Sequence, residues 1–313
     1  MSAPADVLSG SQLPASPVVA IPFARRLYWL VRRELWEFRS LYIGPFAAAV
    51  LTVIGGFFAA VKLPGKLHAA AALSAADQIR IVQDPYNFAA LLLMLATFLL
   101  SVVYCLEALY SERRDRSILF WKSQPVSDTL TVLSKAFIPL IFLPLYTFVL
   151  TVAVQIAMVL MSVVSLTLSG VGTSLLWAGL PLLNMWTGIL FHLITVHSLW
   201  YAPFFGWFLF ISAYARRVPL LWATLPVLAL ALIERMAFGT SNFLMFVLRR
   251  FGGNDSDPPY PANTMTHGPM GSGTVGHLMH PDILFSPGLW TGLAVTAIFL
   301  TLAIRLRRVR EPH

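Results

Sequence analysis

The chain has 313 residues and a net charge of +8, with 58% hydrophobic and only 12% charged residues. An average soluble domain has about 25% charged residues, and a soluble fold of this length could not hide so much apolar surface. The composition therefore excludes an ordinary soluble protein and indicates one whose outer surface faces lipid.

Residues 1–22 are rich in Ser, Pro and Ala, and we expect them to form a disordered cytosolic tail. They lack the basic start and apolar run of a cleavable signal peptide. Residues 25–39 predict an amphipathic helix on the membrane surface, because apolar side chains share one arc and arginines the other. A short helix packed only on protein would show a similar stripe. The residues expected at the interface are Arg25, Trp29, Arg32, Arg33, Trp36 and Arg39.

Six apolar segments reach the length of about 20 residues that a membrane span requires. They are residues 41–61, 88–110, 136–166, 191–215, 218–238 and 286–304. Residues 62–87 and 239–287 would then form external loops, and residues 171–186 either a short interfacial helix or an extension of the fourth span. The sequence thus predicts an all-α polytopic membrane protein, with residues 23–313 as one transmembrane domain.

The distribution of basic residues predicts the orientation. Most of the 22 Lys and Arg residues lie in the N-terminal helix, between spans two and three, between spans four and five, and after span six. The positive-inside rule places these segments and both termini in the cytosol, so we expect a multi-pass protein of the inner (plasma) membrane. Its basic flanks would meet anionic membrane lipid. Nucleic acid is not an expected partner, since no basic soluble domain is present.

A polar segment separates the second and third spans. Residues 112–122 predict a short helix, with Glu112 and Asp115 favourably placed near its start. Pro125 disfavours a helical conformation at the residue before it, and Ser127 can cap the next helix. Glu107, just before the segment, could pair with one of its arginines. A solvated loop is the simpler interpretation, but the adjacent apolar side chains of residues 120 and 121 are typical of a binding surface.

The stretch Glu-Arg-Arg-Asp-Arg-Ser-Ile-Leu-Phe-Trp-Lys-Ser-Gln-Pro-Val-Ser-Asp, residues 112–128, resembles the cytosolic loop of ABC-2-type transporter permeases. The stretches Trp-Tyr-Ala-Pro at 200–203 and Ser-Ala-Tyr-Ala-Arg-Arg at 212–217 are also similar to such permeases. The layout of an amphipathic helix, six spans and this motif between spans two and three extends the resemblance over residues 20–310. The external segment 239–287 is longer than the family pattern, which puts the outer gate in doubt.

The resemblance implies a division of labour between two kinds of subunit. A coupling helix would sit in a cleft of a separate ABC ATPase subunit, and two permeases, as a homodimer, would work with two ATPases. The favoured function is export of a lipid-like, peptide or antibiotic-like amphipathic substrate. The residues implied in ATPase coupling are Glu112, Arg113, Arg114, Asp115, Arg116, Ile118, Phe120, Trp121 and Lys122.

The chain itself is not expected to be an enzyme or to bind a cofactor. It has no G-x-x-x-x-G-K-[ST] phosphate loop, so ATP and Mg would be bound by the partner ATPase. It also lacks H-E-x-x-H and G-x-S-x-G motifs, and no catalytic residue is predicted. The alternative function is a non-transporting membrane anchor that transmits ATPase work to an external partner through residues 239–287. An ion-driven carrier is disfavoured because mid-membrane carboxylates are scarce.

Glu234 and Arg235, near the end of the fifth span, could line the outer exit, contact the second permease, or lie in the head-group layer. His192 and His197 are five residues apart on a helix and cannot face one metal ion, so we expect each to be hydrogen-bonded between helices. Cys105 is the single cysteine, which excludes disulfides within the chain.

Thioether and imidazole groups gather in the second external segment, and such groups bind soft ions such as copper(I). Their spacing matches no closed site, so chance enrichment in a Gly-rich loop is the favoured interpretation and no metal is predicted. The residues concerned are Met265, His267, Met270, His277, Met279 and His280.

Overall fold

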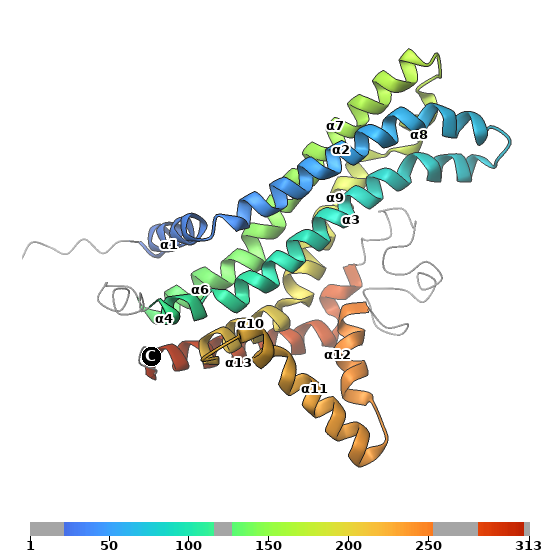
Figure 1. The fold of residues 1–313 in the computed structure, drawn as a ribbon. Helices are drawn as coiled ribbons and strands as arrows, with labels where there is room; N and C mark the ends of the chain where they lie inside the picture. Colours follow the sequence, from blue (N-terminus) through green and yellow to red (C-terminus); the bar gives the residue numbers. More distant parts are fainter. Residues whose placement is uncertain (1–21, 116–126, 253–280, 310–313) are drawn as a thin grey trace, which may run out of the picture.

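The computed structural model describes residues 22–115, 127–252 and 281–309, and these residues form helices and no strand (Figure 1). The helices before residue 170 are α1 (Phe23–Glu37), α2 (Ser40–Ala69), α3 (Ala75–Glu107), α4 (Tyr110–Arg114), α6 (Asp128–Phe137), the π-helix η1 (Ile138–Phe142) and α7 (Leu143–Leu168). Those that follow are α8 (Ser174–Gly179), α9 (Leu182–His192), the π-helix η2 (Leu193–Trp200), α10 (Ala202–Tyr214), α11 (Pro219–Phe238), α12 (Asn242–Gly252), the 3-10 helix η5 (Pro281–Phe285) and α13 (Pro287–Val309).

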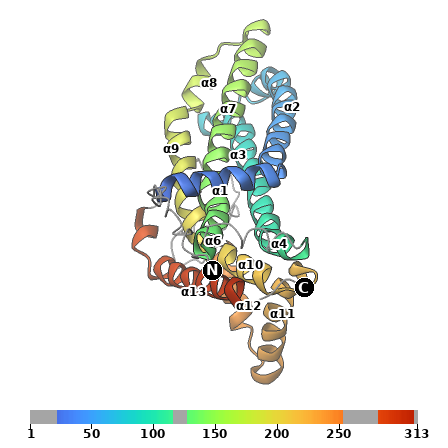
Figure 2. The same cartoon turned by 90° about the vertical axis from the view of Figure 1, so that its left-hand side faces the viewer.

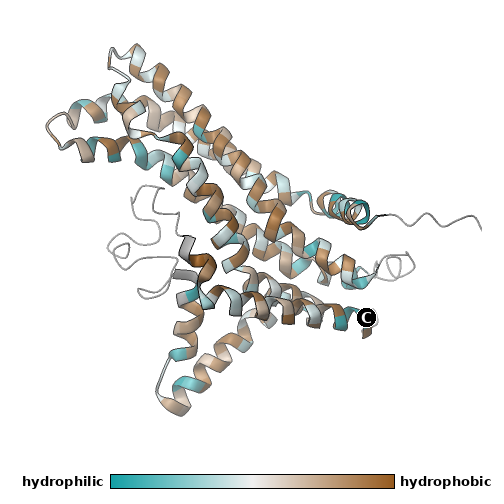
Figure 3. Ribbon diagram, turned by 180° about the vertical axis from the view of Figure 1, so that it is seen from behind, coloured by the Kyte–Doolittle hydropathy of each residue, from teal (hydrophilic) through white to brown (hydrophobic). Residues whose placement is uncertain are grey.

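Six helical stretches of the described chain are long and apolar enough to cross a membrane, as the composition predicts. They are Ser40–Ala69, Ala75–Arg114, Asp128–Leu168, Ser174–Trp200, Pro219–Phe238 and Pro287–Val309. Many large apolar side chains are also exposed, and Figure 3 shows hydrophobic residues along most of the helices. The chain is therefore an all-helical protein with the properties of a multi-pass membrane protein.

Most of the expected external segment 62–87 is helical, and the turn between the two helices is short. Helix α2 continues to Ala69 and α3 begins at Ala75, where the Ser74 side chain caps it by accepting a hydrogen bond from the Asp77 backbone N–H at 3.3 Å. The external location of residues 62–87 stays a prediction. The charged residues of this region mark the expected edge of the hydrocarbon layer, and both helices continue beyond it.

The fourth span also differs from the predicted residues 191–215. The stretch that begins at Ser174 passes through α9 and the π-helix η2, and the helix breaks at Tyr201 before α10. The Tyr201 backbone N–H bonds the Val196 carbonyl at 3.0 Å, a wide turn of the π type. Pro203 then occupies the first turn of α10, where a missing N–H is tolerated. Residues 171–186 contain the separate short helix α8 and the start of α9, and the location of α8 at the outer interface stays a prediction.

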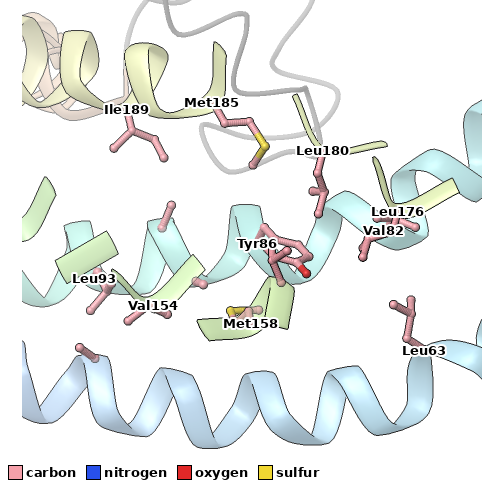
Figure 4. Packing of buried hydrophobic residues seen from close by; sticks show 14 of the residues in the cluster. Leu63, Val82, Tyr86, Leu93, Val154, Met158, Leu176, Leu180, Met185 and Ile189 are labelled. Carbon is pink, nitrogen blue, oxygen red and sulfur yellow. The ribbon is translucent and has the colours of Figure 1, made fainter. Parts of the chain in front are cut away.

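The main core lies where α2, α3 and α7 pack together beneath α8 and α9. Figure 4 shows Tyr86 of α3 close to Met158 of α7, with Met185 and Ile189 of α9 on the other side of α3. The Tyr86 hydroxyl lies 3.0 Å from the Ser162 hydroxyl of α7, which satisfies both buried groups. A second packed unit is formed by α10 against α13, where Gly206 allows close approach to Thr296.

Helix α11 projects away from the rest of the chain, and α12 runs back from its far end towards α13 (Figure 1). Only Pro219 and Ala223 of α11 are buried, and apolar side chains are exposed around the whole helix. A helix that is apolar on every side needs lipid or another protein around it. The exposed apolar residues of α11 include Leu220, Leu221, Trp222, Leu225, Leu228, Leu230, Leu232, Ile233, Met236 and Phe238.

Helix α1 runs across the bundle instead of along it, as Figure 2 shows. The end of the bundle where α1, α4, the start of α6 and the last turn of α13 meet is called the charged end below. On the outward side of α1, the Arg32 guanidinium lies 5.1 Å from the Trp29 ring centre and 4.8 Å from that of Trp36. Exposed tryptophans combined with arginine suit a helix at a lipid–water boundary.

Candidate functional site

Three fully buried charged side chains meet at the charged end. Lys135 of α6 places its Nζ 2.9 and 3.0 Å from the two carboxylate oxygens of Glu34 of α1. The same Nζ lies 3.1 Å from Oε1 of Glu112 in α4. None of these three side chains is exposed. One ammonium therefore joins helices that are about 100 residues apart in the chain.

Arg33 reinforces this junction from the rim of the site. Its Nη2 lies 2.7 Å from Oε1 of Glu34 and 2.9 Å from Oε1 of Glu112. The hydroxyl of Tyr104, near the end of α3, donates to Oε2 of Glu34 at 3.1 Å. The two carboxylates thus share two cations, which satisfies acceptor oxygens that would otherwise be buried without partners.

Arg307, in the last turn of α13, completes what we call the buried charge network. Its Nη1 bonds Oε2 of Glu112, and its Nε bonds Oδ1 of Asp128 at 2.9 Å. Glu112 precedes residues 116–126 in the chain and Asp128 follows them. A single guanidinium therefore holds both ends of this polar segment against α13.

The charges of the network balance, since Glu34, Glu112 and Asp128 face Arg33, Lys135 and Arg307. Burying ions is costly, and their attraction offsets that cost only when each has close partners of opposite sign. Removing one partner from such a buried pair typically costs about 3–5 kcal/mol, because the other charge is left uncompensated. The network therefore strongly favours one arrangement of α1, α4, α6 and α13.

Glu37 lies at the edge of the network and has a different environment. Its Oε2 is 3.7 Å from Nε of Arg33, and its side chain is 36% exposed. Partial burial, followed by the negative charge of Glu34, raises the pKa of Glu37 above its ordinary value. The fold thus disfavours the ionised form of Glu37.

The end of α10 holds α4 in place. The Ser212 hydroxyl accepts hydrogen bonds from the backbone N–H groups of Leu109 and Tyr110 at 3.0 and 2.9 Å. Arg113 donates to the carbonyls of Ser212 and Ala215, the latter at 2.8 Å. A cation at the carboxyl end of a helix is favourable for the helix dipole. The chain can therefore turn from α3 into α4 without leaving these polar groups unsatisfied.

The expected coupling residues divide into three groups. Glu112 and Arg113 were expected in a helix offered to a partner, but the structure buries both against other parts of this chain. Their charges are needed for internal contacts, which the helical pattern did not reveal. Arg114 and Asp115 are exposed and paired at 3.0 Å. Arg116, Ile118, Phe120, Trp121 and Lys122 lie outside the described residues.

Helix α4 ends at Arg114, and Asp115 is its C-cap with a non-helical backbone. The helix predicted over residues 112–122 is therefore interrupted at Asp115. Arg114 also lies 3.8 Å from Glu107, the pairing that the sequence suggested. Both side chains are exposed, so this contact contributes little stability.

Most of the residues expected at the membrane interface lie on the outward side of α1. Arg25, Trp29, Trp36 and Arg39 are exposed, and Arg32 stacks on both tryptophan rings. Arg33 differs, since its side chain turns inward to the buried charge network.

Glu234 and Arg235 stabilise the turn between α11 and α12. The Glu234 carboxylate accepts hydrogen bonds from the Thr240 hydroxyl and from the backbone N–H groups of Asn242 and Phe243, each at 2.7 Å. A carboxylate at a helix N-terminus satisfies free N–H groups and the helix dipole. Arg235 donates to the Gly239 carbonyl at 3.0 Å. A role in a substrate exit or a subunit contact remains a prediction.

His197 lies in an aromatic environment. Its ring centre is 6.1 Å from that of Phe98 and 5.9 Å from that of Phe205. No hydrogen-bond partner for its Nε2 is found among the described residues, so the interhelical hydrogen bond expected there is not observed. Cys105 is buried in the core as a free thiol.

The described part of the chain contains no cluster of three or more His, Cys, Asp or Glu side chains that could hold a metal ion. The six Met and His residues between 265 and 280 lie outside the described residues. Residues 1–21 of the expected tail also lie outside them.

Sequence reasoning missed the cations that pair with Glu112 and the two other carboxylates that share these cations. The cations are Arg33, Lys135 and Arg307, and the carboxylates are Glu34 and Asp128. One signal for Glu34 was present. It follows Leu27 and Leu30 at helical spacing and so shares the face of α1 that contacts the bundle. A carboxylate on that face requires a buried cation, but the sequence alone does not say which one.

No family model, curated protein or solved structure matches this chain. The arguments about function therefore rest on the chain's own residues and on the resemblance of residues 112–128 to ABC-2-type permeases.

Proposed function

We propose that this chain is the permease subunit of an ATP-driven ABC transporter of the ABC-2 type. It would export an amphipathic substrate, such as a lipid-like molecule, a peptide or an antibiotic, with energy supplied by a separate ATPase subunit. Six helices of spanning length, the polar motif between the second and third of them and the missing phosphate loop support this proposal.

The observation that carries the proposal is that Arg307 binds both Glu112, which precedes residues 116–126, and Asp128, which follows them. A partner that pulls or pushes this segment acts through Glu112 and Asp128 on α13. Through Lys135 and Arg33 the same displacement reaches α1. Because separating buried ion pairs is costly, the elements at the charged end move together, as a protein driven by an external motor requires.

The proposal also assigns a side of the membrane. Basic residues are concentrated at the charged end, and the positive-inside rule favours a cytosolic location for that end. Both termini and residues 116–126 would then face the compartment that contains ATP. Helix α1 would lie in the cytosolic head-group layer, with the exposed Trp29 and Trp36 in the lipid.

The exposed surface of α11 supports a pair of permeases. The helix buries only two residues within the described chain, and most of its remaining side chains are apolar. A second copy of the chain, packed against part of α11, would form the homodimer in which two ATPases can act together.

The test of the proposal uses the full chain co-expressed with a candidate ABC ATPase, such as one encoded by a neighbouring gene. The variant Trp121→Ala/Arg114→Glu should lose co-purification of the ATPase and substrate-stimulated ATP hydrolysis in reconstituted membranes. The matched control, Trp177→Ala/Arg80→Glu, changes exposed residues at the opposite end of the bundle and should retain both. Unchanged association and hydrolysis in the first variant would overturn the assignment.

The second candidate function is a membrane anchor that transmits ATPase work to an external protein. The contacts of α12 with the fourth and sixth spans support this alternative. Arg250 of α12 donates to the carbonyls of Trp200 and Gly288 at 3.1 Å each. Movement of the fourth and sixth spans would thus reach the external segment 239–287. Substrate accumulation in sealed vesicles supports the transporter, whereas an external protein bound without any transport supports the anchor.

A further inference from the structure

A groove with a volume of about 780 Å³ runs between α2 and α3 in the half of the bundle away from the charged end. Its α2 side extends from Leu51 to Ala69, continued by Ala70 and Leu73, and its α3 side extends from Ile81 to Leu92. Met158 of α7 also lines it, and Figure 4 shows this side chain between α2 and α3. The lining is mainly apolar and therefore suits a hydrocarbon ligand.

Two adjacent glycines explain the space. A Cβ on Gly55 would meet no atom within 4 Å, so this position opens directly onto the groove. A Cβ on Gly56 would lie 2.6 Å from Cγ of Met158, so that glycine lets the methionine approach α2. Larger residues at these positions would fill the groove or displace its wall.

Charged groups of opposite sign lie in the outer part of the groove. Lys66 of α2 and Asp84 of α3 both line it, and both side chains are exposed. Within the described chain, neither side chain takes part in an ion pair or hydrogen bond. A ligand with an anionic and a cationic group could therefore pair with both.

The dimensions match one leaflet of a membrane. Leu51 and Lys66 are 15 positions apart on α2, which at 1.5 Å per residue gives a length of about 22 Å. Half of the hydrocarbon core of a bilayer is about 15 Å thick, with the head groups beyond it. The apolar part of the groove then lies at the depth of acyl chains, and Lys66 and Asp84 lie at the depth of head groups.

We propose that this groove binds one zwitterionic phospholipid with an amine head group. An acyl chain lies along Gly55 between α2 and α3, the phosphate pairs with Lys66, and the ammonium pairs with Asp84. A phospholipid without the amine would leave Asp84 unpaired next to its phosphate, so charge complementarity favours phosphatidylethanolamine over phosphatidylglycerol. The proposal does not depend on the coupling function proposed above.

The first test measures lipid retained by the full chain. The protein is reconstituted with equal amounts of phosphatidylethanolamine and phosphatidylglycerol, transferred to mild detergent and examined by native mass spectrometry. We expect one retained phosphatidylethanolamine per chain. Gly55→Leu should lower its occupancy by about tenfold, because the new side chain occupies the acyl position, and a tenfold loss corresponds to about 1.4 kcal/mol.

Gly65→Leu is the matched control, since a Cβ at Gly65 also meets no atom within 4 Å but Gly65 does not line the groove. It should retain the lipid like the unmodified chain. Equal retention by the unmodified chain and by Gly55→Leu would overturn the proposal. A change of oligomeric state in Gly55→Leu, without any retained lipid in the unmodified chain, would show that a second copy covers the groove, and this also overturns it.

The second test concerns the head group. Asp84→Asn should remove the preference for phosphatidylethanolamine, so that both lipids are retained about equally. Lys66→Ala should reduce retention of both, because both carry the phosphate. Lys62→Ala changes an exposed lysine one turn earlier that does not line the groove, and it should change neither property. Identical lipid preferences in Asp84→Asn and in the unmodified chain would contradict the assigned polar contacts.

Discussion

Glu34 and Lys135 form an ion pair in which neither side chain is exposed, although they come from α1 and α6 and are 101 residues apart in the chain. The pair fixes a surface helix to the start of a membrane span. It thereby explains how a helix that crosses the bundle can be part of the same packed unit (Figure 2).

Glu34→Gln should destabilise the protein by about 3–5 kcal/mol, because Lys135 loses its closest carboxylate while remaining buried. The measurement is thermal or denaturant unfolding of the full chain in detergent micelles. Glu37→Gln is the control and should change stability by less than about 1 kcal/mol, since the fold already disfavours its ionised form. A double variant, Glu34→Met/Lys135→Met, should recover much of the loss. Equal effects of Glu34→Gln and Glu37→Gln would contradict the buried pair.

Arg307→Gln should release both ends of residues 116–126 from α13. Hydrogen–deuterium exchange of residues 110–130 should become faster, while exchange in the core of α7 stays unchanged. If the chain is a permease, transport should fall more than ATP hydrolysis, because the ATPase subunit would still hydrolyse ATP without moving α13. Arg308→Gln alters an exposed neighbouring guanidinium and should leave exchange at residues 110–130 as it was. The same acceleration in both variants would argue against a specific role for Arg307.

Ser212→Ala should cost about 2 kcal/mol, because the backbone N–H groups of Leu109 and Tyr110 lose their shared acceptor in a buried site. Unfolding of the purified chain measures this loss. Ser169→Ala, at an exposed position after α7, should be close to neutral. A neutral Ser212→Ala would mean that another acceptor is available to these groups.

Gly292→Ala should disturb the attachment of α12. A Cβ at Gly292 would lie 2.0 Å from Nη2 of Arg250, which must move and then loses its contacts with Trp200. We expect destabilisation of about 1–3 kcal/mol, typical of overpacking, and a change in Trp200 fluorescence. Gly55→Ala, whose Cβ meets nothing within 4 Å, provides the comparison. Equal stability of the two variants would contradict the close packing at Gly292.

The sequence predicted the class of the fold because spanning helices depend mainly on local composition. The fifth span, predicted at residues 218–238, agrees with α11 at Pro219–Phe238 to within one residue. The predicted spans do not give the ends of the helices, since a helix such as α2, at Ser40–Ala69, continues beyond the predicted span of residues 41–61. The π-helix before Tyr201 was also missed, because Pro203 shows where a helix is disturbed but not how the preceding turns adjust.

The candidate site was predicted only in part. The polar segment was found because its charges interrupt apolar sequence, and Glu112 and Asp115 were assigned to the same exposed helix. The structure separates them, with Glu112 buried and Asp115 exposed. Whether a carboxylate faces solvent or a buried Lys135 depends on contacts between distant parts of the chain, and helical periodicity contains no information about those contacts.

The equal number of positive and negative groups in the buried charge network has an electrical consequence. A membrane potential does work of about 2.3 kcal/mol per 100 mV on each elementary charge that crosses it. Three cations and three carboxylates that move together transfer no net charge, so the voltage across the membrane neither assists nor opposes their displacement. A joint displacement of these six described groups would therefore cost the same free energy in an energised cell and in a depolarised one.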